Sequence, residues 1–272
     1  VSERLAKLGH ESYVLAGESE ADKPKCEEIN GVHVIRWPMW APNHAYHVPR
    51  RHKLLQHFLC NLAKDVDVIH FHDIHSVFTA YCLGTIRPFD VRKILTPYYH
   101  GSGHTSFRKL LWVFWRCYLK RLFRATSGVS VHTVSKSEAR LFKRHYGVDA
   151  TPIQNGVDEW ILSVEWRPSN YMMYSGRIEK YKNVHRLADV ARILNENFDL
   201  DAKLKIIGDG PFKRVLRELL KHKGIEYELL PSQPFIKYVD YLSRAKLFCL
   251  ISEKESYPQS VNEANAIGVP VL

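Results

Sequence analysis

Two glutamates near the end of the chain, Glu255 and Glu263, are the first residues whose types and spacing indicate chemistry. Pro258 lies between them and suits the first position of a helix, where a missing N–H costs nothing, and Gly268 would end that helix. The free N–H groups of a helix start suit a phosphate, and carboxylates suit the hydroxyls of a sugar. The stretch therefore fits a nucleotide-sugar, although two surface glutamates beside a solvated helix start fit the spacing equally well.

A basic loop follows the predicted strand 171–175 and begins with Gly176. Arg177 could clamp a diphosphate through paired hydrogen bonds, and Lys182 could do so as a point charge. Ligands of open α/β sheets bind beyond the carboxyl ends of the strands, which is where this loop falls. Taken alone, however, the loop is better interpreted as a solvated basic turn.

Two glycines and a histidine follow other predicted strands. Gly208 and Gly210 come after strand 204–207 and would let a ligand approach the backbone closely, although a structural turn also needs glycines. His100 comes after strand 93–96 and could donate a hydrogen bond to a substrate oxygen or a phosphate. A hydrogen-bonded loop histidine is an equally good interpretation of His100.

A histidine cluster lies at the end of the predicted strand 66–71, where His70, His72 and His75 flank Asp73. Strand alternation puts His70 and His72 on the same side, but a second group of metal ligands is not evident in the sequence. We therefore favour polar residues that face a cleft over a zinc site.

Short strand-like runs alternate with segments of helical periodicity along the whole chain. The predicted strands are residues 11–15, 32–37, 66–71, 93–96, 128–134, 171–175, 204–207, 225–229 and 247–251. The predicted helices are residues 2–8, 51–64, 76–83, 107–124, 136–145, 184–195, 212–223 and 236–244. This alternation is typical of parallel, doubly wound sheets. Because the stretch 158–170 is irregular, we expect an α/β protein with two Rossmann-like domains, residues 1–160 and 161–272, facing a cleft.

Composition narrows the class of protein. The 272 residues are 45% apolar, and no apolar run reaches the ~20 residues of a membrane span. Five widely spaced cysteines, an odd number, indicate a reduced, cytoplasmic protein. The formal charge of +10 indicates an anionic partner, which charge alone does not identify: phosphates, an anionic membrane or nucleic acid.

The predicted helix 107–124 combines an apolar face with six basic residues. The apolar positions at helical spacing are Leu111, Phe114, Tyr118 and Leu122, and the face is widened by Trp112, Trp115 and Leu119. The basic positions are Arg108, Lys109, Arg116, Lys120, Arg121 and Arg124. A helix that lies on a membrane surface would have this pattern. A helix packed on the core with a basic outer edge would have it too, and we favour that second interpretation.

Several motifs occur in an order that covers nearly the whole chain. They are VSERLAKLGHESYVL, DVDVIHFHD, VHTVSKSEARLF, IQNGVD, YSGRIEKYKN, LKIIGDGP and the closing stretch from Glu255 to Val271. Together they resemble the retaining glycosyltransferases of family 4, known as glycosyl transferases group 1, which have the GT-B fold. The resemblance implies a hexosyltransferase that moves a sugar from a nucleotide-sugar donor to an acceptor with retention of anomeric configuration.

The resemblance also implies roles for individual residues. Arg177 and Lys182 would hold the donor diphosphate and stabilise the departing nucleotide. Glu263 would bind the ribose hydroxyls, and Glu255 those of the transferred sugar. His100 would lie near the reacting sugar.

Backbone groups would complete the donor site in such an enzyme. They would come from Gly176, Gly208, Gly210 and Ser260. The resemblance implies no cofactor and no metal, only the nucleotide-sugar as co-substrate. The acceptor would be a sugar, a lipid-linked molecule or another hydroxyl compound, and nucleic acid is not expected. Contact with an anionic membrane, on its cytoplasmic face, stays open.

Some features depart from the family pattern. The family's first strand would precede Val1, and its closing strands and final helix would follow Leu272. Pro258 has no N–H for a phosphate, so Gln259 and Ser260 would supply these donors. We therefore expect a fragment whose two domains are both incomplete and which is inactive or poorly folded alone, while its complete parent is active.

Two other functions remain to be distinguished. A nucleotide-sugar epimerase or phosphorylase can share this fold, and analysis of the products from a labelled donor would separate it from a transferase. A basic, non-catalytic protein that binds nucleic acid or membrane would show a steep dependence on salt.

Overall fold

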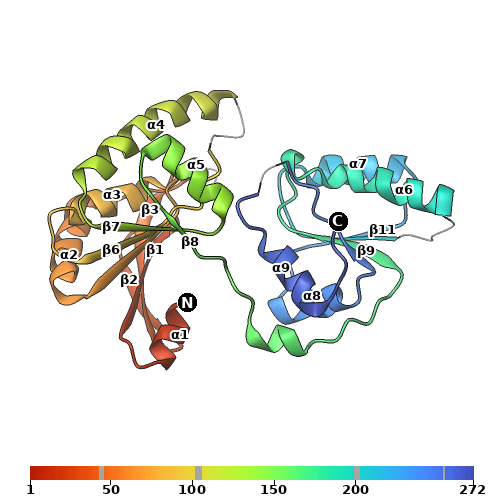
Figure 1. Ribbon diagram of the computed structural model, residues 1–272, viewed down its shortest axis with the longest axis horizontal. Helices are drawn as coiled ribbons and strands as arrows, with labels where there is room; N and C mark the ends of the chain where they lie inside the picture. The colour runs from red at the N-terminus through yellow and green to blue at the C-terminus, as the bar shows by residue number, and fades with distance from the viewer. Residues whose placement is uncertain (43–45, 102–105, 199–202, 254) are drawn as a thin grey trace. The chain divides into compact units, whose positions relative to one another are not determined.

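The computed structural model describes residues 1–42, 46–101, 106–198, 203–253 and 255–272. The chain divides into two compact units, Val1–Ile153 and Gln154–Leu272, and each is described by itself (Figure 1). Both are α/β units with parallel strands, which confirms the fold class predicted from the sequence. The division falls a few residues before the predicted boundary at 160/161.

The first unit contains two four-stranded sheets. In one, β1 (Ser12–Glu18) pairs in parallel with β3 (Val32–Trp40), and β3 also pairs antiparallel with β2 (Lys25–Ile29) and β4 (Val48–Pro49). The other has the all-parallel order β5 (Val68–His72), β6 (Arg92–Thr96), β7 (Val129–Thr133) and β8 (Thr151–Pro152). The sequence did not predict β2, because every residue of this charged strand is exposed and no hydrophobic pattern marks it.

The helices of the first unit lie close to their predicted positions. They are α1 (Ser2–Lys7), α2 (His52–Asp65), α3 (Val77–Ile86), α4 (Ser106–Ala125) and α5 (Lys136–Tyr146). Local signals set the ends of α5: the Ser135 hydroxyl accepts a hydrogen bond from the backbone N–H of Glu138, and Gly147 ends the helix in the left-handed region.

Helix α4 packs on the core through part of the apolar face that the sequence indicated. Leu111, Phe114 and Tyr118 are exposed, whereas Leu122 is buried. The core receives Trp112, Leu119 and Leu122 from that face, and Phe123 beside it. Apolar residues occur around most of this helix, so their periodicity alone did not identify the buried face.

The second unit is built on one parallel sheet with helices on both faces (Figure 1). Its strand order is β11 (Tyr227–Leu230), β10 (Lys203–Ile207), β9 (Tyr171–Ser175) and β12 (Leu247–Phe248). Its helices are α6 (Leu187–Phe198), α7 (Lys213–His222), α8 (Phe235–Ser243) and α9 (Gln259–Ile267). Beyond these strands, Val271 forms an isolated parallel bridge with Phe248.

Alternation along β9 shows why this sheet is covered on both sides. Met172 and Tyr174 belong to one buried cluster, and Met173 belongs to the other. Successive side chains of a strand point to opposite faces. A strand whose side chains are buried on both sides therefore requires a layer of helices on each face, as the doubly wound prediction expected.

The start of the closing helix corrects one detail. Pro258 is the residue before α9, with φ −76° and ψ 108°, rather than its first helical residue. Its extended backbone turns the loop into the helix, and Gly268 ends the helix at φ 87° as predicted. None of the helices described is long and apolar enough to cross a membrane.

Candidate functional site

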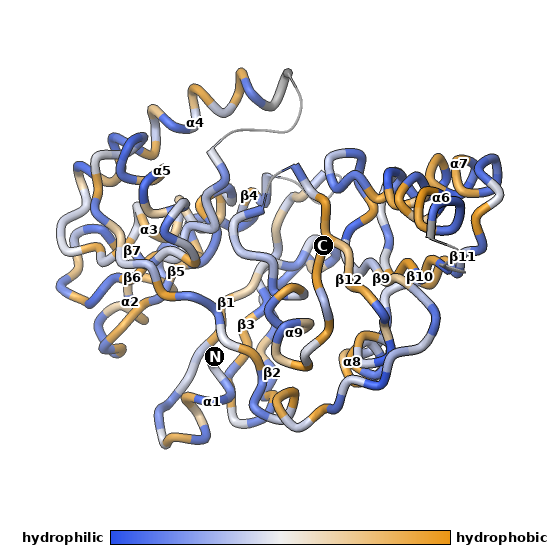
Figure 2. Tube along the Cα trace, turned by 45° about the vertical axis from the view of Figure 1, so that its right-hand side comes forward, coloured by the Kyte–Doolittle hydropathy of each residue, from blue (hydrophilic) through white to orange (hydrophobic). Residues whose placement is uncertain are grey.

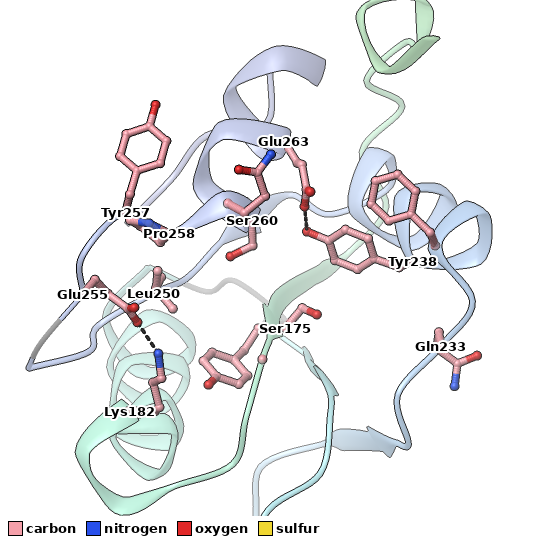
Figure 3. Close-up of a pocket in the computed structure, with 14 residues that line it drawn as sticks. Ser175, Lys182, Gln233, Tyr238, Leu250, Glu255, Tyr257, Pro258, Ser260 and Glu263 are labelled. Atoms are coloured by element: carbon pink, nitrogen blue, oxygen red, sulfur yellow. Dashed lines mark hydrogen bonds and ion pairs between the residues drawn. The ribbon is translucent and has the colours of Figure 1, made fainter. Parts of the chain in front are cut away.

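A pocket of about 500 Å³ opens beyond the carboxyl end of β9 in the second unit (Figure 3). It is lined from the loop after β9, the starts of α8 and α9, and the segment between β12 and α9. The lining residues are Tyr174, Ser175, Gly176, Lys182, Gln233, Phe235, Tyr238, Leu250, Glu255, Tyr257, Pro258, Gln259, Ser260 and Glu263. Five of the sequence-predicted site residues therefore share one hollow: Gly176, Lys182, Glu255, Ser260 and Glu263.

Lys182 and Glu255 form an ion pair at one side of this pocket (Figure 3). The Lys182 ammonium donates to Glu255 Oε1, although 73 positions separate the two residues in the chain. Their side chains are only 14% and 26% exposed, so water screens the pair less than it would on an open surface. The pocket thus holds a fixed cation and a fixed anion in contact with each other.

Glu263 is buried on the opposite side of the pocket and accepts a hydrogen bond of 2.8 Å from the Tyr238 hydroxyl. Burial raises the pKa of the Glu263 carboxyl, the negative charge of Asp158 adds to the rise, and the Tyr238 hydrogen bond opposes it. Burial also raises the pKa of Tyr238, so its hydroxyl stays a donor at neutral pH. One Glu263 oxygen is thereby fixed by the protein.

Two side-chain oxygens, at the start of α9 and in the loop before it, are buried without a partner among the described residues. Gln259 Nε2 donates to the carbonyl oxygen of Gly156 at 2.7 Å, whereas Gln259 Oε1 is buried without a partner among the described residues. Ser252 Oγ is likewise buried without a hydrogen-bond partner among the described residues. Buried polar atoms normally find a partner, so these atoms are consistent with a polar ligand at this end of the unit.

A smaller hollow of about 170 Å³ shares residues with the first, among them Ser175 and Gly176. Arg177 and Gly208 line it. The Arg177 guanidinium lies 2.5 Å from a Glu179 oxygen, and its side chain is 75% exposed. Arg177 is therefore next to the larger pocket without lining it.

The two glycines of the second loop serve close packing between backbones. A Cβ on Gly208 would lie 2.0 Å from the carbonyl oxygen of Gly176, and a Cβ on Gly210 would lie 2.3 Å from that of Ile178. Gly208 lines the smaller hollow, but Gly210 lines neither of the two. The structural interpretation accounts for both glycines, and the predicted contact with a ligand stays a prediction.

His100 belongs to the first unit, in an aromatic stack. Its ring lies 4.2 Å from that of His75, with an angle of 17° between them, and His75 stacks in turn on Trp112 at 4.6 Å. The predicted role of His100 near the reacting sugar stays a prediction.

The histidine cluster has a packing explanation. The rings of His70 and His72 lie 4.1 Å apart, as strand alternation predicted. Burial and, second, the positive charge of His72 lower the pKa of His70 to about 4, and His70 Nε2 contacts Thr96 Oγ1 at 2.8 Å. Among the residues that the structure describes, no group of three or more histidines, cysteines, aspartates or glutamates is arranged to hold a metal ion.

Sequence reasoning missed one wall of the pocket, formed by Gln233, Phe235 and Tyr238. A signal was present: Pro234 stands after the predicted strand 225–229 and two positions before the predicted helix 236–244. The start of a helix that follows a parallel strand lies at the carboxyl edge of the sheet, where ligands bind. Residues on the first turn of that helix were therefore candidates.

The two α/β units with parallel sheets have the GT-B fold of glycosyltransferases. The model of Glycosyltransferase Family 4 matches residues 1–160, and the model of Glycosyl transferases group 1 matches residues 161–272. The chain therefore belongs to glycosyltransferase family 4.

Individual proteins similar to the chain match either a part of its sequence or its fold. N-acetyl-alpha-D-glucosaminyl L-malate synthase of Bacillus anthracis is 35% identical over 99 residues, which is 35% of this chain and 25% of that protein. Sucrose-phosphate synthase of Thermosynechococcus elongatus superposes with a TM-score of 0.73 at 17% identity, over 99% of this chain and 72% of that one. An E. coli structure described as trehalose-6-phosphate bound with UDP-2-fluoro glucose superposes with a TM-score of 0.70 at 11% identity, over 97% of this chain and 77% of that one. The sequence match thus spans about a quarter of the curated relative.

Proposed function

We propose that this protein transfers a sugar from a nucleotide-sugar donor to an acceptor hydroxyl, with retention of anomeric configuration. The observation that carries the proposal is the larger of the two hollows described in the second unit, which combines a partly buried lysine, a buried carboxylate and the start of a helix. A nucleotide-sugar presents phosphates, ribose hydroxyls and sugar hydroxyls, and each of these finds a suitable partner there.

The cations are the source of catalysis in this proposal. Breaking the bond between the sugar and the diphosphate leaves negative charge on the departing nucleotide. Lys182 in the pocket and Arg177 beside it would stabilise that charge, which is worth most where water is excluded. The ion pair that Lys182 forms with Glu255 would open as the phosphates take the ammonium and the sugar hydroxyls take the carboxylate. The Lys182 ammonium would thus face a negative group both before and after the donor binds.

The remaining contacts would orient the donor. Glu263, fixed through one oxygen by Tyr238, would accept hydrogen bonds from the ribose hydroxyls. Ser260 lines the pocket on the first turn of α9, and its backbone N–H would face the phosphates, whereas the Gly176 N–H already donates to the Ile207 carbonyl at 3.0 Å. His100 would act near the reacting sugar from the first unit. Retention of configuration is proposed from the family resemblance.

Donor binding and donor chemistry test this proposal together. Isothermal titration with uridine, guanosine and adenosine diphosphate-sugars should find one base that binds. Lys182→Met should weaken its binding at least about tenfold, because a charge-assisted hydrogen bond is lost. Lys180→Met, on the same turn but exposed and outside the pocket, is the matched control and should change little. Equal losses for both variants would refute the site.

The anomeric outcome needs its own measurement on the product. The proton NMR coupling of the anomeric hydrogen in the transferred sugar should match that of the donor. An inverted product would contradict retention while leaving the donor site intact. A product that is an epimerised nucleotide-sugar would contradict transfer itself.

A further inference from the structure

Helix α4 has a second apolar face that the described residues of the protein leave exposed. Its exposed apolar side chains are Leu110 at 58%, Leu111 at 38%, Val113 at 46%, Phe114 at 68% and Tyr118 at 47% exposure. Figure 2 shows hydrophobic residues recurring along the described part of this helix. Five large apolar side chains on neighbouring turns form a continuous patch, which a monomeric protein rarely leaves in water.

The opposite face of α4 already anchors the helix to the first unit. Trp112 and Leu119 are buried there in the core. The indole N–H of Trp112 donates to the Gly101 carbonyl at 2.9 Å, and that of Trp115 donates to the Ile74 carbonyl at 3.0 Å. The exposed apolar face is therefore additional to what folding of this unit requires.

The charges beside the patch all have one sign. Lys109 precedes it and is exposed, and Arg121 and Arg124 continue the same side of the helix beyond Tyr118. Helix α4 contains no acidic residue in its sequence. It packs against α5 through Phe123 and Phe142, and α5 exposes four more basic residues. They are Lys136, Arg140, Lys143 and Arg144, of which Lys143 is paired with Asp149 at 2.6 Å.

We propose that α4 binds the first unit to the surface of an anionic membrane. Leu110, Val113 and Phe114 would enter the boundary of the acyl chains, and Arg121 and Arg124 would contact lipid phosphates. Exposed apolar side chains beside clustered basic ones are the pattern of a helix that lies in the membrane interface. A second copy of the chain would bring the same positive charge to this face, whereas an anionic bilayer compensates it. This inference does not depend on the donor site.

Sedimentation with lipid vesicles tests the proposal. The chain should bind vesicles with about 30 mol% phosphatidylglycerol in phosphatidylcholine, bind pure phosphatidylcholine at least tenfold more weakly, and release at high salt. Leu110→Gln with Phe114→Gln should weaken binding at least tenfold, and so should Arg121→Glu with Arg124→Glu. Circular dichroism would confirm that these surface variants are folded.

Matched controls come from the second unit. Val215 and Ile236 are 47% and 77% exposed, and Arg214 and Arg217 are exposed on α7. Changing the first pair to Gln, or the second pair to Glu, should leave vesicle binding unchanged. Equal binding to both kinds of vesicle, no binding, or equal losses in the control variants would overturn the proposal.

A fluorescent label reports on the face itself. Cys117 is exposed on α4, so a polarity-sensitive dye can be attached there after Cys26 and Cys60 are replaced by Ser. Its emission should shift to the blue only with anionic vesicles, while the same dye on Cys26, with Cys60 and Cys117 replaced by Ser, should not respond. A blue shift that appears without lipid and grows with protein concentration would assign the face to a second copy instead.

Discussion

The hydrogen bond from Tyr238 to Glu263 permits a quantitative test of the pocket. Tyr238→Phe removes only the hydroxyl oxygen and leaves the buried ring in place. A hydrogen bond to a charged acceptor contributes about 1.5–3 kcal/mol, and one to a neutral acceptor contributes about 1 kcal/mol. We expect Tyr238→Phe to lower the free energy of unfolding by about 2 kcal/mol at pH 8 or so, where Glu263 is ionised, and by about half as much near pH 4.

The pH dependence has a definite sign. Burial raises the pKa of Glu263 above its ordinary value, and the hydrogen bond from Tyr238 makes this rise smaller. A carboxyl whose folded-state pKa is raised contributes stability below its unfolded pKa and loses that contribution as the pH rises through the folded value. Removing the hydroxyl raises the pKa of Glu263 further. The variant must therefore lose more stability than the original protein as the pH rises.

Urea denaturation followed by circular dichroism measures this at both pH values. Tyr171→Phe is the matched control, because its hydroxyl donates to the backbone carbonyl of Tyr241 at 2.6 Å. Because a backbone carbonyl does not titrate, Tyr171→Phe should lower the free energy of unfolding by about 1 kcal/mol at either pH. If Tyr238→Phe costs the same at both pH values, Glu263 is not the ionised acceptor and the reasoning fails.

Two further predictions concern packing. Gly208→Ala should lower the free energy of unfolding by more than about 3 kcal/mol, because its φ is +145° and the new Cβ would lie 2.0 Å from the Gly176 carbonyl oxygen. Gly147→Ala is the control: its φ is +73° but the new Cβ would meet open space, so it should lower the free energy of unfolding by only about 1 kcal/mol in the same urea measurement. Equal losses of stability in the two variants would contradict the close approach at Gly208. Burial raises the pKa of Cys82 and of Cys249 to about 12, so both thiols should resist a thiol reagent at neutral pH until the protein unfolds. Mass spectrometry after brief labelling should find the two exposed cysteines modified first, and early labelling of the buried pair would refute this.

Short-range patterns determined much of the fold. Strand β9 has the predicted bounds, Tyr171–Ser175, because five consecutive apolar or small residues between turn residues suffice to mark a buried strand. The two ends of α5 are set by equally local contacts, at Ser135 and at Gly147, because the hydrogen bonds that end a helix span only a few residues. The ordered motifs, taken together, also identified the family.

Only the tertiary structure decided which distant residues meet. The contact between Lys182 and Glu255 spans 73 positions, and that between Tyr238 and Glu263 spans 25. Each depends on the strand order that brings its loops to one edge of the sheet, which no local pattern encodes. The exposed face of α4 was undecided for a related reason: apolar residues surround most of that helix, so its buried side depends on which neighbours cover it.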